Sequence, residues 1–150
     1  MTYELRLERQ FDAPPEAVFD TFVNKTSQGV LHGAEQRGWD VEVVQTDVRV
    51  GGTSIVRMGP QGREPDTETR VYSVVDRPHR LELRYSMELA ESGLSLDTEM
   101  TITFEDRDGG TLFTMVETGF EEEAARDGFR EGWTEYLETL GKVLKARHDT

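Results

Sequence analysis

The chain has 150 residues, a length that fits one domain, and we predict a single domain over residues 1–150. It contains no cysteine, which excludes a disulfide framework, thiolate chemistry and a cysteine-based zinc site. Its formal net charge of −13 repels polyanions, so neither nucleic acid nor an anionic membrane surface is expected as a partner.

The N-terminal part is predicted to hold one strand and two short helices. Apolar and charged residues alternate over Tyr3–Glu8, which is typical of a half-buried strand. Pro14 and Pro15 suit a helix start, because a proline in the first turn gives up only a donor that would be unpaired anyway. A second short helix is predicted over Thr26–Leu31, followed by a loop that reaches Gly38.

From Trp39 onward the apolar period changes to two, which predicts six consecutive strands. Turn residues such as Gly51-Gly52 and Asp108-Gly109-Gly110 separate the runs and are typical of hairpins, so the sheet should be antiparallel. The predicted strands cover residues 39–50, 53–58, 67–76, 80–90, 96–106 and 111–119.

The last thirty residues carry an apolar stripe at three- and four-residue spacing, which predicts a long amphipathic helix. Gly128, Gly132 and Gly141 interrupt this helix, and each costs about 1 kcal/mol relative to alanine in a helix interior. Two explanations stay open: a close approach of the helix backbone to the sheet or the first helix, and a helix that begins only after Gly128. The stripe consists of Phe129, Trp133, Tyr136, Leu137, Leu140, Val143 and Leu144.

This order of elements predicts an α+β fold in two layers, with a curved antiparallel sheet of six to seven strands that grips the long C-terminal helix. Two short helices follow the first strand. One helix cannot fill the concave side of a curled sheet completely, so we expect a cavity between the two layers.

Six segments stand out along the chain, in this order: FDAPPEAVFDTFVN, DVRVGG, MGPQG, VYSVVDRPHRLEL, ITFEDRDGGTLFTMVETGF and GWTEYLETLGKVL. Together they resemble the START-like or SRPBCC helix-grip superfamily, in particular the branch named after the C-terminal domain of the activator of Hsp90 ATPase. The resemblance implies the helix-grip fold. It leaves the function open, because this superfamily hosts ligand carriers, cyclases, hydroxylase domains and co-chaperone modules.

We predict that residues of the inner sheet face and the last helix line the cavity, with ordinary core packing as the alternative for the apolar ones. Glu117 points into this space if the side of the strand that carries it faces the helix, and its carboxyl group then needs a hydrogen-bonding or charged partner or has a raised pKa. The alternative is that Glu117 lies near the end of its strand and contacts water. Whether Arg57 points inward depends on the register of the strand after Gly51-Gly52, which the sequence leaves ambiguous by one residue. The predicted lining residues are Trp39, Ile55, Arg57, Tyr72, Leu83, Tyr85, Met87, Met100, Ile102, Phe113, Met115, Glu117, Trp133, Tyr136 and Leu137.

No catalytic or cofactor motif occurs in the sequence. There is no GxSxG, P-loop or GxGxxG pattern. No histidine has a second ligand at metal-binding spacing. We therefore predict no catalytic residue, no metal and no cofactor. His32 is a candidate for the cavity entrance, against the ordinary alternative of a solvated histidine.

The favoured hypothesis is a cytoplasmic module that binds a small apolar or amphipathic molecule, as a monomer or a homodimer. No apolar run approaches the roughly 20 residues of a membrane span, and the N-terminus lacks an apolar signal region. Two alternatives stay open. One is a cyclase- or dehydratase-type enzyme that uses Glu117, a tyrosine or His32 as acid or base. The other is a protein-interaction module that acts on a chaperone.

Overall fold

The computed structural model describes residues 1–33 and 37–148, with side chains through Arg147. Residues 34–36 of the predicted loop lie outside this range. The elements are β1 (Tyr3–Phe11), α1 (Pro15–Val23), α2 (Lys25–Leu31), β2 (Trp39–Gln45), β3 (Thr53–Pro60), β4 (Asp66–Asp76), β5 (Arg80–Glu88), β6 (Ser95–Arg107), β7 (Gly110–Phe120) and α3 (Glu123–His148).

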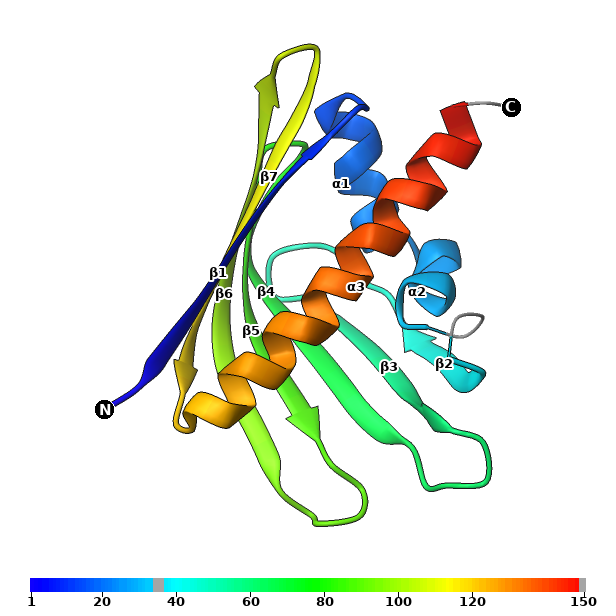
Figure 1. Cartoon of the computed structure of the whole chain (residues 1–150), viewed down its shortest axis with the longest axis vertical. Coiled ribbons are helices and arrows are strands. Elements are labelled where there is room, and N and C mark those ends of the chain that lie inside the picture. Colours follow the sequence, from blue (N-terminus) through cyan, green and yellow to red (C-terminus); the bar gives the residue numbers. More distant parts are fainter. Residues whose placement is uncertain (34–36, 149–150) are drawn as a thin grey trace.

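The seven strands form one antiparallel sheet in the order β1-β7-β6-β5-β4-β3-β2. The sheet is curved, and α3 runs diagonally across it, with α1 and α2 on the same side (Figure 1). This arrangement confirms the predicted helix-grip α+β fold. The first and last strands in sequence pair with each other, so the chain returns to its start before α3 begins.

Local chemistry explains where several elements begin and end. Pro15 opens α1, and the side chain of Asn24 caps α2 by accepting a hydrogen bond from the backbone N–H of Thr26. The prediction that β2 extends to residue 50 is wrong. After Gln45 the chain closes on itself through a hydrogen bond from the backbone N–H of Gly52 to the carbonyl of Arg49, and it cannot continue the ladder.

Neither explanation offered for the glycines of the last helix holds. The helix α3 begins at Glu123, well before Gly128. A Cβ atom built on Gly128 or Gly132 meets nothing within 4 Å, so no neighbouring backbone approaches them closely. Their small size leaves open space beside α3 instead.

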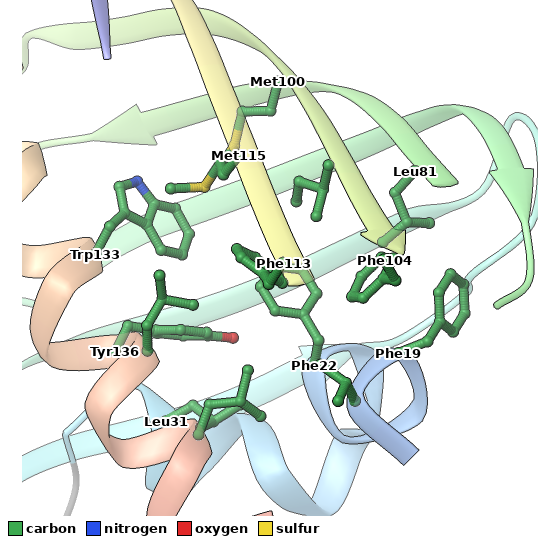
Figure 2. Close-up of a cluster of buried hydrophobic side chains, with 14 of the residues drawn as sticks. Phe19, Phe22, Leu31, Leu81, Met100, Phe104, Phe113, Met115, Trp133 and Tyr136 are labelled. Atoms are coloured by element: carbon green, nitrogen blue, oxygen red, sulfur yellow. The ribbon is translucent and has the colours of Figure 1, made fainter. Parts of the chain in front are cut away.

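The closed part of the core lies under the C-terminal half of α3. Phe104 and Phe113 pack edge to face at 5.4 Å between ring centroids, and Phe22 of α1 contacts both rings (Figure 2). Leu137 and Leu140 of α3 are buried in this same cluster. Half of the apolar stripe of α3 therefore forms ordinary core.

Candidate ligand-binding pocket

A pocket of about 460 Å³ lies beside the middle of α3, between this helix, the end of α2 and strands β2 to β5. We call it the α3 pocket. Phe129 and Trp133 of α3 form one wall, and Met58 and Met87 form part of the sheet side. Gly128 and Gly132 also line it, Gly128 exposed to solvent and Gly132 half-buried. Its volume falls within the range that is typical of small-molecule sites.

Five of the fifteen predicted lining residues line the α3 pocket: Trp39, Tyr85, Met87, Trp133 and Tyr136. Trp133 and Tyr136 project from α3 toward the sheet (Figure 2), and their rings pack at 5.0 Å between centroids. The remaining predicted residues, apart from the two on β3 described below, are buried on the inner side of the sheet or α3 without lining this pocket: Tyr72, Leu83, Met100, Ile102, Phe113, Met115, Glu117 and Leu137.

The inward direction predicted for Ile55 and Arg57 is wrong by one residue. The buried side chains of β3 are Ser54, Val56 and Met58, so Ile55 and Arg57 lie on the outer face. Arg57 is partly exposed there and pairs with Glu64 at 3.6 Å between nitrogen and oxygen.

A buried carboxylate, Glu68 of β4, forms the floor of the pocket. Its Oε1 accepts from Nε of Arg70 at 3.0 Å, and its Oε2 accepts from the hydroxyl of Tyr85 at 2.8 Å. Burial by itself raises the pKa of Glu68. The charge of Arg70, together with His32 and Tyr85, outweighs burial and holds that pKa well below its ordinary value. Glu68 is therefore an ionised group at the base of an apolar pocket.

His32 follows α2 directly and lines the same pocket. Its Nε2 lies 3.0 Å from Oε1 of Glu68, and its Nδ1 lies 2.8 Å from the carbonyl oxygen of Gln28. Both partners are oxygen atoms that can accept a hydrogen bond. The placement agrees with the hypothesis that His32 belongs to the cavity, although its ring is buried rather than solvated.

Arg70 sits behind the pocket wall as the buried counterion of Glu68. Its guanidinium stacks over the rings of Phe22, Trp133 and Tyr136 at 5.3 to 5.9 Å from their centroids. Burial alone lowers its pKa, but the charge of Glu68 raises that pKa well above the ordinary value, so Arg70 stays charged.

Glu117 forms a second buried polar group on the core side of Trp133. Its Oε2 accepts from the hydroxyl of Thr98 at 2.6 Å, and its Oε1 accepts from Nε1 of Trp133 at 3.1 Å. Burial raises the pKa of Glu117 to about 7 against the lowering effect of these two hydrogen bonds. Of the two alternatives for Glu117, the structure has the inward one, whereas Arg57 lies on the opposite face of the sheet.

Sequence reasoning missed the central role of Glu68. A signal was present, because Glu68, Arg70 and Tyr72 alternate along β4, and an inward Tyr72 requires both charged residues to point inward as well. The contact of Glu68 with His32 joins residues 36 positions apart on different elements, which no local pattern predicts.

Within the described residues, no group of three or more potential ligands could hold a metal ion. None of the described helices combines the length and apolar character needed to cross a bilayer.

Comparison with known structures places this geometry in a recognised fold. Ms6760 from Mycobacterium smegmatis is 21% identical, with 94% of this chain and 90% of that chain aligned and a TM-score of 0.77. CV1439 from Chromobacterium violaceum is 22% identical, with 94% and 96% aligned and a TM-score of 0.78. DynU16, a protein in the dynemicin biosynthetic locus, is 16% identical; the alignment covers 95% of this chain and 47% of that chain, with a TM-score of 0.74. No curated protein matches the chain in sequence.

These structural similarities, all below 25% identity, show the fold alone. A family model described as activator of Hsp90 ATPase homolog 1-like protein matches residues 12–145, which is nearly the whole chain and includes the residues of the α3 pocket named above. The chain therefore belongs to the activator of Hsp90 ATPase homolog 1-like family, with the helix-grip fold.

Proposed function

We propose that the chain is an intracellular binding protein that holds a small apolar or amphipathic molecule in the α3 pocket. The observation that carries this proposal is the pocket itself, about 460 Å³ between aromatic side chains of α3 and the sheet, with the buried carboxylate of Glu68 at its floor. The family and the fold support a ligand-binding or cyclase-like domain in general.

Two glycines of α3 add to the support for the proposal. A glycine inside a helix lowers stability by about 1 kcal/mol relative to alanine. Gly128 and Gly132 bring no close backbone contact in return, since a Cβ atom at either position meets nothing within 4 Å. Both line the pocket. What these residues provide is unfilled volume beside the aromatic wall, which is what a bound molecule requires.

Catalysis is less well supported than binding. Three titratable groups converge at the pocket floor: His32, Glu68 and Tyr85. A general base needs a free lone pair that faces the substrate. Both ring nitrogens of His32 are engaged with acceptors, and the hydroxyl of Tyr85 donates to Glu68. His32 and Tyr85 are therefore both used within the cluster, and Glu68, whose pKa is held well below its ordinary value, is a weak base.

The alternative that the chain interacts with a chaperone is supported by the description of its family, which names the activator of Hsp90 ATPase. A cytoplasmic location and a monomeric or dimeric state stay predictions.

A pocket-filling substitution tests the proposed function. Gly132→Leu adds a side chain that points into the pocket, and its Cβ has room. Gly29→Leu is the matched control, because Gly29 is also a helical glycine with open space at Cβ but does not line the pocket. Binding is followed through the fluorescence of N-phenyl-1-naphthylamine, a neutral apolar probe.

We expect the unaltered protein and Gly29→Leu to bind the probe with similar affinity, and Gly132→Leu to bind it at least about tenfold more weakly. A tenfold loss corresponds to about 1.4 kcal/mol of binding free energy. Unchanged binding by a folded Gly132→Leu protein would overturn the proposal, and so would a failure of the unaltered protein to bind.

A further inference from the structure

We infer that the polar head of the bound molecule is an uncharged hydroxyl group that donates a hydrogen bond to Glu68. The inference rests on the proposed function and adds a ligand class to it: a neutral alcohol or phenol with an apolar, ring-sized body. It follows from which hydrogen-bonding groups at the pocket floor are already used.

The hydrogen-bond donors of the aromatic residues at the pocket floor are all bound to acceptors of the protein itself. Trp133 donates from Nε1 to Glu117 at 3.1 Å. Tyr136 donates its hydroxyl proton to Oε1 of Gln28 at 3.3 Å, and Tyr85 donates to Oε2 of Glu68 at 2.8 Å. A ligand group that can only accept, such as an ether, ketone or carboxylate, finds no free donor among them.

The ring of His32 adds no donor for a ligand. Its Nδ1 faces the carbonyl oxygen of Gln28 at 2.8 Å, and its Nε2 faces Oε1 of Glu68 at 3.0 Å. Both nitrogens are therefore directed at protein acceptors rather than at the pocket.

The carboxylate of Glu68 can still accept a hydrogen bond from a ligand. Oε1 of Glu68 accepts from both His32 and Arg70. Among the described residues, Oε2 accepts from Tyr85. A carboxylate oxygen has two lone pairs, so Oε2 can accept one further hydrogen bond. A charge-assisted hydrogen bond to a buried carboxylate is stronger than one between neutral groups, which makes Oε2 the strongest vacant position at the floor.

The charge balance favours a neutral head. Glu68 is already paired with the buried guanidinium of Arg70 and contacts His32 and Tyr85, so an ammonium group would lose its hydration without a free counter-charge. Arg37, Glu135, Glu138 and Lys142, which also line the pocket, lie at its exposed rim, where water screens them. The remaining charged lining residue, Asp66, is already paired with Arg63 at 3.0 Å. A hydroxyl group can donate at Oε2 without bringing any charge into the pocket.

Four naphthalene probes that share one body test the inference by titration calorimetry with the full chain. They are 2-(2-naphthyl)ethanol, its methyl ether, 2-(2-naphthyl)ethylamine and the carboxylate 2-(2-naphthyl)acetate. We expect the alcohol to bind tightest and each other probe to bind about tenfold more weakly, the ratio that follows when one hydrogen bond at a buried charged group is lost. An ether that binds as tightly as the alcohol, or a tighter amine or acetate, would overturn the inference while leaving the proposed function intact. If no probe binds, the proposed function itself is overturned, and the inference with it.

A substitution then assigns the preference to Glu68. Glu68→Gln places an amide at the floor, and the alcohol-to-ether ratio should fall to within about threefold, because an amide nitrogen donates to the ether oxygen. Glu99→Gln is the matched control, since it also removes one acidic charge but lies exposed on β6. A preference that survives unchanged in folded Glu68→Gln protein would overturn the assignment. If that variant does not fold, the probe ranking on the unaltered chain still decides the inference.

Discussion

The carboxyl group of Glu117 should make the stability of this protein fall as pH rises through the weakly acidic range. It is fully buried between β6, β7 and α3, and burial raises its pKa from the ordinary value of 4.5 to about 7. Between these two values the folded protein keeps the proton that the unfolded chain releases. Because the unfolded state then binds fewer protons, the free energy of unfolding decreases as pH rises from 4.5 to 7.

The size of the effect follows from the pKa difference. Each pKa unit corresponds to 1.36 kcal/mol, so a rise from 4.5 to about 7 costs the folded state about 3 kcal/mol once Glu117 is ionised. Glu117→Gln removes this cost. Glutamine has the shape of the protonated acid, its oxygen can accept from Trp133, and its amide can donate to the hydroxyl of Thr98.

Urea unfolding, followed by tryptophan fluorescence at several pH values from 4.5 to 8, measures this difference. We expect Glu117→Gln to be close to the unaltered protein in stability at pH 4.5 and about 3 kcal/mol more stable relative to it at pH 8. Neighbouring charges at Glu68 and Arg70 are present in both proteins and largely cancel in the comparison. Glu99→Gln, an exposed substitution on the same sheet, should show no such trend. A stability difference between Glu117→Gln and the unaltered protein that stays constant across this pH range would refute the reasoning.

Three further substitutions probe the pocket wall and floor. Trp133→Ala removes a buried ring and the indole donor of Glu117, so urea unfolding should show a loss of about 3–5 kcal/mol, and a loss below 1 kcal/mol would contradict its place in the core. Glu68→Gln leaves the charge of Arg70 buried without its anion and should also cost about 3–5 kcal/mol, whereas replacing both residues by methionine should recover most of that loss. Because the pKa of Glu68 is lowered, its contribution to stability is present above about pH 4.5 and is lost in acid, so the decline in acid should be smaller in the double variant. Gly132→Ala should raise the free energy of unfolding by up to about 1 kcal/mol, measured in the same way, and a destabilised variant would show that the space beside α3 is not open.

The fold could be predicted from the sequence because the chain alternates cleanly where one face is buried. In β5 and β6 apolar residues such as Leu83 and Met100 alternate with charged ones, so a single register satisfies the core. In β3 the pattern fails, because Ile55 and Val56 are adjacent β-branched residues and either can point inward. The inward Ser54 then pairs with the hydroxyl of Tyr72, which the sequence pattern does not indicate.

The pocket could be predicted only in part. The aromatic residues of α3 were identified because helical periodicity places Trp133 and Tyr136 on the buried face. Whether a buried residue faces a cavity or closed core depends on the packing of distant elements, and Met87 lines the pocket whereas Met115 does not. The contact of Glu68 with His32, which follows α2, joins distant parts of the chain and leaves no trace in the local sequence pattern.

The five methionines offer the most direct test of the claim that the α3 pocket binds a small molecule. Met58 and Met87 line the pocket, Met100 and Met115 lie in the buried core without lining it, and Met1 is exposed. In a spectrum of protein labelled with ¹³C at the methionine methyl groups, titration with 2-(2-naphthyl)ethanol should shift the signals of Met58 and Met87. The signals of Met1, Met100 and Met115 should stay in place. Shifts spread equally over all five methyl groups, or no shift at Met58 and Met87, would contradict the account.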